Sequence, residues 1–138
     1  MNQVLQIALQ AVNDKKGIDV VVLDISAVAT FADYFLVCSG DSVRQIQAIV
    51  DEVEQKMAAH GQRPSHVEGY TNAEWVLMDY GDLIVHVFSK RARAYYDLER
   101  LWRDATILDA AALLTRSAPE SAPALRPRRR RPGSPSGS

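Results

Sequence analysis

The chain has 138 residues, 47% of them hydrophobic, and its 16 basic and 17 acidic side chains give a formal charge of −1. Its one cysteine excludes an internal disulfide framework and a paired-cysteine metal site. The longest apolar run is far shorter than the about 20 residues that span a bilayer, and the N-terminus lacks a signal-peptide pattern. We therefore expect a cytoplasmic protein with no membrane contact.

Charge and proline content divide the chain into two parts. The second part, residues 117–138, holds one acidic residue, five of the six prolines, none of the ten aromatic residues and five arginines: Arg126, Arg128, Arg129, Arg130 and Arg131. Such a composition buries too little apolar surface to offset the entropy of ordering the segment. We predict one folded domain at residues 1–116, with 11 basic and 16 acidic side chains, followed by a disordered, basic, proline- and arginine-rich tail at 117–138.

The sequence of the first half of the domain predicts two helices separated by two strands. Apolar residues recur at helical spacing near the N-terminus until Gly17, which suits a C-cap. Ser42 and Gln45 have the spacing of a capping box, so a helix is expected to start there. In chain order we predict a helix over 3–15, buried strands over 19–25 and 34–39, and a helix that ends at Gly61.

The second half predicts a β-hairpin, with a short strand near 64–68 before it and a helix after it. The hairpin strands at 75–80 and 83–88 flank Gly81-Asp82, and glycine in the first turn position suits a type II′ turn. A helix is expected from Ala92, and residues 107–114 are expected to extend it or to form another helical segment. Its apolar stripe would consist of Tyr95, Leu98, Leu101 and Trp102.

These elements predict an α/β (α+β) domain in which helices pack on a small mixed β-sheet of about five strands. Nucleotidyl transfer with two metal ions would require converging carboxylates, which on a strand usually stand at positions i and i+2. No predicted strand has that pair, and no histidines have the spacing of metal ligands. His86 alternates with apolar neighbours and is expected to be a packed histidine that makes a hydrogen bond. We predict no metal and no cofactor, and the missing acidic pair argues against a metal-dependent transferase.

Two further features have more than one interpretation. The turn at 39–42 precedes a helix N-terminus, where phosphates bind, but a turn with an N-cap explains it as well. Trp75, Leu77 and Asp79 should share one strand face, and adjacent Tyr95 and Tyr96 cannot both face inward, because they are about 100° apart on a helix. At least one aromatic ring should therefore be exposed, as in protein-binding hot spots.

The residues also resemble a known family. The matching segments are Asp33-Tyr34-Phe35, Ser39-Gly40, Arg44-Gln45, Glu68-Gly69, Trp75-Val-Leu-Met-Asp79, Gly81-Asp82, Val85-His86-Val87-Phe88 and Tyr96-Asp-Leu-Glu-Arg-Leu-Trp102. In this order, over residues 3–105, they are similar to the ribosomal silencing factor family (RsfS, also called Iojap-like). The tail lies outside the resemblance.

The resemblance implies a protein that is not an enzyme and has a nucleotidyltransferase-like topology without catalytic carboxylates. Family members bind the large ribosomal subunit at its protein number fourteen, on the face that meets the small subunit. They repress translation under nutrient limitation by blocking subunit joining, and free members are commonly homodimers. The alternative interpretation is a divergent nucleotidyltransferase-like nucleotide-binding protein that uses the turn at 39–42.

The acidic charge of residues 1–116 suits a basic ribosomal protein as partner. We expect the partner-binding surface to contain Trp75 as anchor, with Asp79, Tyr96 and Glu99 in support and Arg44 as a lesser contact. Core packing is the alternative role for Trp75, and hairpin stabilisation for Asp79. The arginines at 126–131 would either add a weak contact to rRNA by counterion release or serve solubility.

Overall fold

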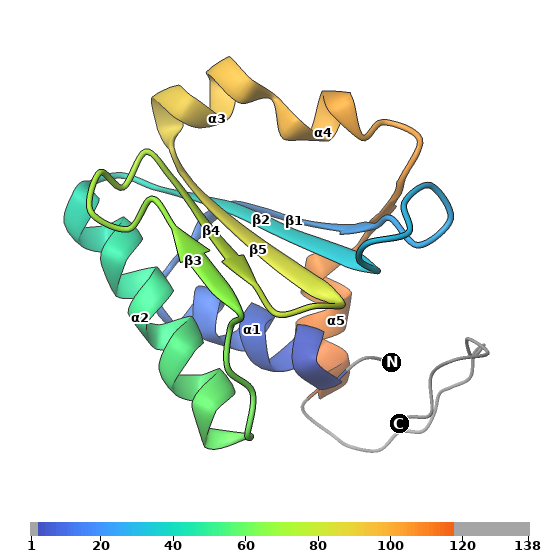
Figure 1. The fold of residues 1–138 in the computed structure, drawn as a ribbon, viewed down its shortest axis with the longest axis horizontal. Coiled ribbons are helices and arrows are strands. Elements are labelled where there is room, and N and C mark those ends of the chain that lie inside the picture. The colour runs from blue at the N-terminus through green and yellow to red at the C-terminus, as the bar shows by residue number, and fades with distance from the viewer. Residues whose placement is uncertain (1–2, 118–138) are drawn as a thin grey trace.

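Six strands form one open, mixed sheet with helices on both faces (Figure 1). The computed structural model describes residues 3–117. Strand order is β3-β4-β5-β2-β1-β6, and β5 and β2 are parallel whereas the other neighbours are antiparallel. The strands are β1 (Ile18–Asp24), β2 (Tyr34–Gly40), β3 (His66–Glu68), β4 (Trp75–Asp79), β5 (Leu83–Ser89) and β6 (Thr106–Leu108). The helices are α1 (Gln3–Asp14), α2 (Val43–Ala59), α3 (Lys90–Tyr96), α4 (Leu98–Leu101) and α5 (Ala110–Ser117).

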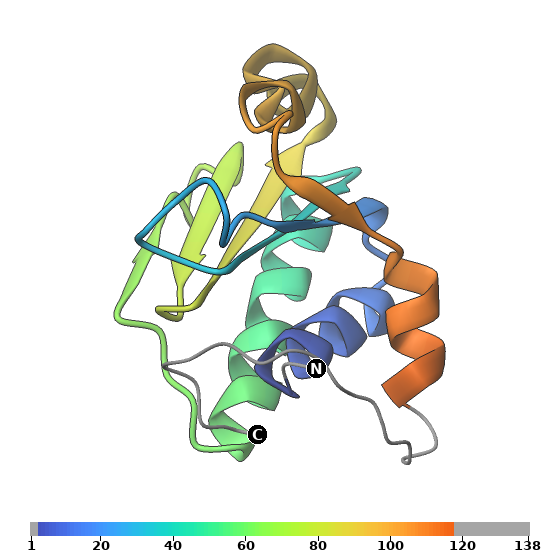
Figure 2. The same ribbon diagram turned by 90° about the vertical axis from the view of Figure 1, so that its right-hand side faces the viewer.

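The sheet separates two apolar cores. Helices α1, α2 and α5 cover one face, and α3 and α4 lie over the other (Figures 1 and 2). The first core holds, among others, Leu5, Leu9, Val12, Ile46, Val50, Val53, Met57, Leu36, Val76, Met78 and Val85. The second core is smaller and includes Leu23, Phe35, Val37, Ile84, Phe88, Ala92 and Leu98. The predicted class is confirmed, with one strand more than expected.

Capping starts α2 where the sequence predicts. The Ser42 hydroxyl accepts a hydrogen bond from the Gln45 backbone N–H at 3.0 Å. Gln45 does not complete the expected capping box, because its Oε1 accepts instead from the Asp41 backbone N–H at 2.6 Å. Its Nε2 donates to the carbonyls of Lys15 and Lys16, so Gln45 ties α2 to the segment that follows α1.

The hairpin also forms as predicted. Of its two central residues only Gly81 has a positive φ, 86°, as a type II′ turn requires. The Tyr80 backbone N–H donates to the Leu83 carbonyl at 2.9 Å and closes the turn. The Asp79 carboxylate accepts from the Gly81 N–H at 2.8 Å, so this side chain stabilises the turn from inside the hairpin.

The prediction of one helix from Ala92 was wrong. The helix starts at Lys90, because the Ser89 hydroxyl accepts from the Ala92 backbone N–H at 3.0 Å and caps it. It breaks at Asp97, which has left-handed backbone angles (φ 45°, ψ 59°) and separates α3 from α4. The apolar stripe therefore does not continue through the break, and Tyr95 is 79% exposed.

Residues 107–114 also differ from the prediction. Their first part belongs to β6, which pairs with β1 through Thr106, Ile107 and Leu108, and only the later part is helical, in α5. This pairing joins segments far apart in the chain, so local periodicity carries little sign of it. Within residues 3–117, no helix has the length and apolarity needed to cross a membrane. The predicted tail, apart from Ser117, lies outside the described residues.

Candidate partner-binding surface

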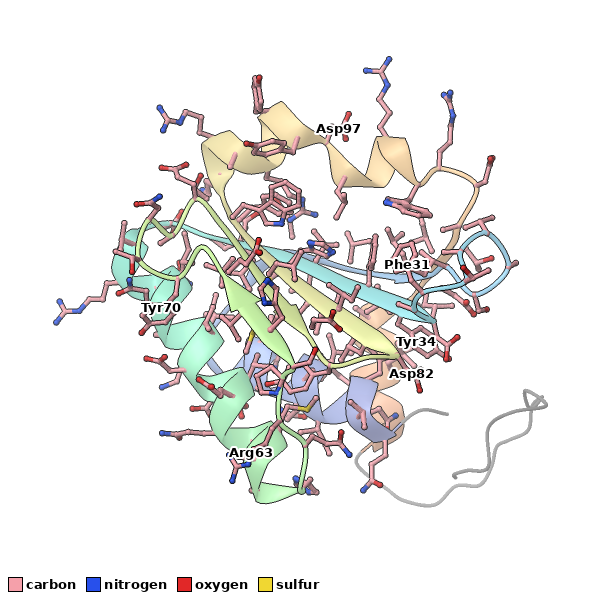
Figure 3. The ribbon with its side chains drawn as sticks, viewed as in Figure 1. Phe31, Tyr34, Arg63, Tyr70, Asp82 and Asp97 are labelled. Carbon is pink, nitrogen blue, oxygen red and sulfur yellow. The ribbon has the colours of Figure 1, made fainter. Side chains whose placement is uncertain are left out.

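A row of rings crosses the sheet face that α3 and α4 cover. Centroids of neighbouring rings lie between 4.6 and 5.9 Å apart. In order, this aromatic row consists of Tyr95, Tyr96, Trp75, His86, Phe35, Trp102 and Phe31. Its middle is buried, whereas Tyr95 at one end is 79% exposed and Phe31 at the other is 57% exposed. Figure 3 shows Phe31 in the loop between β1 and β2, and Asp97 in the segment that joins α3 and α4.

Trp75 lies where the aromatic row reaches the surface. On β4 it stands opposite Phe88 of β5, and the two rings stack at 5.1 Å with an interplanar angle of 28°. Tyr96 of α3 packs on the indole at 4.6 Å and is itself 43% exposed. The side chain of Trp75 is half-buried. It therefore belongs both to the second core and to the surface. Core packing and partner binding, the two roles expected from the sequence, are not exclusive.

His86 of β5 is the polar partner of Trp75. The indole Nε1–H donates a hydrogen bond of 3.0 Å to His86 Nδ1, so the proton of the neutral imidazole sits on Nε2. His86 is only 3% exposed, and within the described residues its Nε2 has no partner. Burial lowers the pKa of His86 to about 4. The imidazole is therefore neutral at physiological pH. The sequence predicts a hydrogen-bonded histidine here, but not its partner.

Two carboxylates lie on the same sheet face as the indole, one further along β4 and one on β3. Asp79 lies on the same face of β4 as Trp75, opposite His66 of β3. Glu68 of β3 is exposed and pairs with His66, and half-buried Leu77 lies between the acidic positions and Trp75. A half-buried apolar centre with an acidic border is a geometry suited to a basic protein partner.

The remaining expected site residues lie differently. Arg44 is exposed near the start of α2, in the helix layer on the opposite face of the sheet from Trp75. Glu99 belongs to α4, and its side chain lies outside the described part of the structure. Of the five predicted contacts, the structure brings Trp75 and Tyr96 together and places Asp79 on the same sheet face.

An open groove of about 500 Å³ lies beside Tyr96 on the α3–α4 layer. Its lining residues are Tyr95, Tyr96, Asp97, Arg100, Arg103 and Asp104. Charged side chains of both signs make up most of this lining, whereas small-molecule pockets are mostly apolar. The groove therefore extends the candidate partner-binding surface as a polar border.

The turn at 39–42 uses its side chains within the domain. The Ser39 hydroxyl accepts from Arg93 of α3 at 2.9 Å, and the Ser42 hydroxyl caps α2. Asp41 pairs with Lys90 at 2.9 Å. Among residues 3–117, no three His, Cys, Asp or Glu side chains are grouped so that they could hold a metal ion.

Comparisons with known proteins find several that are similar to this chain. The family model described as "Ribosomal silencing factor during starvation" matches residues 1–133. A curated protein of Bacillus subtilis named "Ribosomal silencing factor RsfS" is 45% identical, and the match covers 79% of this chain and 94% of that protein. The protein of the same name from Halalkalibacterium halodurans is 43% identical, and the match covers 82% of this chain and 97% of that protein. A crystal structure of a Chromobacterium violaceum protein superposes with a TM-score of 0.72 at 37% identity, covering 75% of this chain and 88% of that one. A mouse protein named "Mitochondrial assembly of ribosomal large subunit protein 1" is 31% identical over 61% of this chain and 38% of its own length.

Proposed function

Because the chain belongs to the ribosomal silencing factor family, we propose that it silences ribosomes by binding the large subunit and blocking the joining of the small subunit. The protein would contact protein number fourteen of the large subunit. It would act in the cytoplasm, when nutrients are limiting. The role in ribosome silencing follows from the family. The subunit, the contact protein and the steric mechanism are the proposal.

The observation that carries the proposal is the surface around Trp75. A half-buried indole that stacks on Phe88 and packs against Tyr96 offers a partly pre-ordered apolar anchor, because core packing already restricts its position. Asp79 and Glu68 place negative charge on the same sheet face, on the far side of Leu77 from the indole, which suits the basic surface of a ribosomal protein. We propose Glu99 of α4 as a further contact of this surface, whereas Arg44, in the helix layer on the opposite face of the sheet, would contact the partner only apart from it.

The mechanism that we propose is exclusion of volume. A folded domain bound to the subunit-joining face occupies space that the small subunit needs, so the two cannot bind together. Inhibition then depends only on occupancy, which is set by the protein concentration relative to the dissociation constant. No bond is made or broken. When free, the protein would form a homodimer, and one protomer would occupy the ribosome.

Preincubation with the protein is expected to prevent subunit joining. Purified large subunits should retain the protein during sedimentation, and light scattering should report fewer joined ribosomes when small subunits are then added. Order of addition is the control, because a steric block should act much less on ribosomes that are already joined. Failure of the protein to co-sediment with large subunits, or unchanged joining at saturating protein, would refute the proposal.

Deleting residues 118–138 is expected to leave binding to the large subunit largely intact. We propose that Arg126 and the four arginines at 128–131 add a weak contact to rRNA phosphates. Five such contacts would steepen the slope of log affinity against log salt by at most about 4.5. The measurement compares full-length and truncated protein in sedimentation assays at several salt concentrations. Complete loss of binding at low salt would show that the tail, not the Trp75 surface, carries the affinity.

A further inference from the structure

We propose that His86 is a positioning residue, whose Nδ1 holds the Trp75 indole in the one orientation that the ribosomal partner recognises. This inference rests on the function proposed above and deepens it. It concerns a residue that makes no contact with the partner, because His86 is only 3% exposed and acts through Trp75.

Strand pairing explains why these two residues meet. Trp75 stands opposite Phe88, and His86 stands opposite Leu77, so the indole and the imidazole are diagonal neighbours on one sheet face. Diagonal neighbours on adjacent strands are within reach of long and aromatic side chains. The indole extends along this diagonal and places its N–H 3.0 Å from His86 Nδ1.

Ring packing alone leaves the orientation of the indole incompletely defined. Phe88 and Tyr96, with centroids at 5.1 and 4.6 Å, restrict the plane of the indole. The outer torsion of tryptophan is broad and roughly two-fold, and a turn of about 180° about it keeps the indole in the same plane, moves its benzene ring to the other side and directs the N–H away from His86. Only one edge of the ring carries the N–H. The buried acceptor on His86 therefore selects one of the two orientations, because a buried N–H without a partner costs free energy.

The orientation determines what the partner contacts. Nε1 is the only polar atom of a tryptophan side chain, and here it is directed at a buried group. The exposed part of Trp75 therefore offers carbon atoms alone. We infer that the partner meets Trp75 with an apolar patch, between basic groups that face Asp79 and Glu68, and needs no hydrogen-bond acceptor for the indole.

The hydrogen bond can be tested in the wild-type protein without any partner. In NMR spectra, the Trp75 indole proton should exchange with solvent much more slowly than that of the same residue in urea-unfolded protein. The spectrum of a Trp75→Phe variant identifies the resonance. Exchange as fast as in the unfolded chain would overturn the proposal.

Variants of His86 test the positioning role. His86→Leu removes the acceptor and is expected to weaken binding to large subunits about fivefold, the loss of roughly one hydrogen bond. His86→Asn keeps an acceptor near the position of Nδ1 and is expected to restore affinity to within about twofold of wild type. In a Trp75→Phe background, which has no indole N–H, His86→Leu should cause no further loss.

Each outcome separates the positioning role from the proposed function. If Trp75→Ala abolishes binding while folded His86→Leu binds as wild type, the surface is right and the positioning role is wrong. An equal loss in the Trp75→Phe background would also refute it, because His86 would then act independently of the N–H. If Trp75→Ala itself binds normally, the proposed surface fails, and the NMR measurement still decides whether the hydrogen bond exists. Thermal unfolding of each variant confirms that only folded protein is compared.

Discussion

Trp75→Ala is expected to weaken binding to the large subunit about 30- to 1,000-fold, which corresponds to about 2–4 kcal/mol for a central aromatic anchor. The variant removes the apolar centre of the surface. Only the acidic residues at its border then remain to contact the partner. Tyr96→Ala should cause a smaller loss, about tenfold, because Tyr96 supports the indole from one side only. Co-sedimentation with purified large subunits at a series of protein concentrations measures both effects.

Folding has to be separated from binding in this experiment. Truncating Trp75 also removes its packing on Phe88, which is expected to cost about 2 kcal/mol of unfolding free energy. Tyr80→Phe is the matched control on the opposite face of the sheet, since the Tyr80 hydroxyl is buried and has no partner within residues 3–117. That variant should bind as wild type. Normal binding by Trp75→Ala would show that the partner uses another surface.

Acid is expected to destabilise the domain through His86. Its pKa is 6.5 in the unfolded chain and about 4 in the folded protein, because burial disfavours the charged imidazolium. The unfolded chain therefore binds a proton at a pH where the folded protein does not. The contribution to stability is complete above pH 6.5 and is lost as the pH falls toward 4. Over the whole window the loss is roughly 3 kcal/mol of unfolding free energy.

His86→Leu isolates this contribution. Urea unfolding at pH 7, 5.5 and 4.5 should show a steeper decline for the wild-type protein than for the variant, whose side chain does not titrate. Asp14, whose pKa is lowered chiefly by its hydrogen bond with Lys56, adds acid sensitivity at lower pH and does so equally in both proteins. Parallel pH profiles for the two proteins would mean that His86 binds its proton as readily in the folded state as in the unfolded chain.

Local signals in the sequence predict much of this fold. The turn at Gly81 and the cap at Ser42 each depend on residues within a few positions of one another, and both form as predicted. The alternation on β4 also places Trp75, Leu77 and Asp79 on one face. The break at Asp97 was not predicted, and the pairing of β6 with β1 could not be, because it joins segments far apart in the chain.

The candidate surface shows the same limit. The adjacency of Tyr95 and Tyr96 predicts an exposed ring, and Tyr95 is exposed. The contact of Trp75 with His86 depends on the register between β4 and β5, which fixes which residues are diagonal neighbours. Burial of His86 depends on the parallel pairing of β5 with β2, which brings Phe35 to 4.6 Å from the imidazole. Neither register nor parallel pairing can be obtained from the composition of one strand.

The parallel pair at the centre of the sheet also has a consequence for synthesis of the chain. Tyr34 pairs with Leu83, so this ladder closes only after a long intervening segment has been made. Non-local pairing of this kind slows folding, because the entropy of loop closure is lost before the contacts form. The Trp75 surface further needs Tyr96 from α3. On the proposed function, a nascent chain that has not yet extended past α3 would lack the complete surface, and the protein would be able to bind ribosomes only late in its own translation.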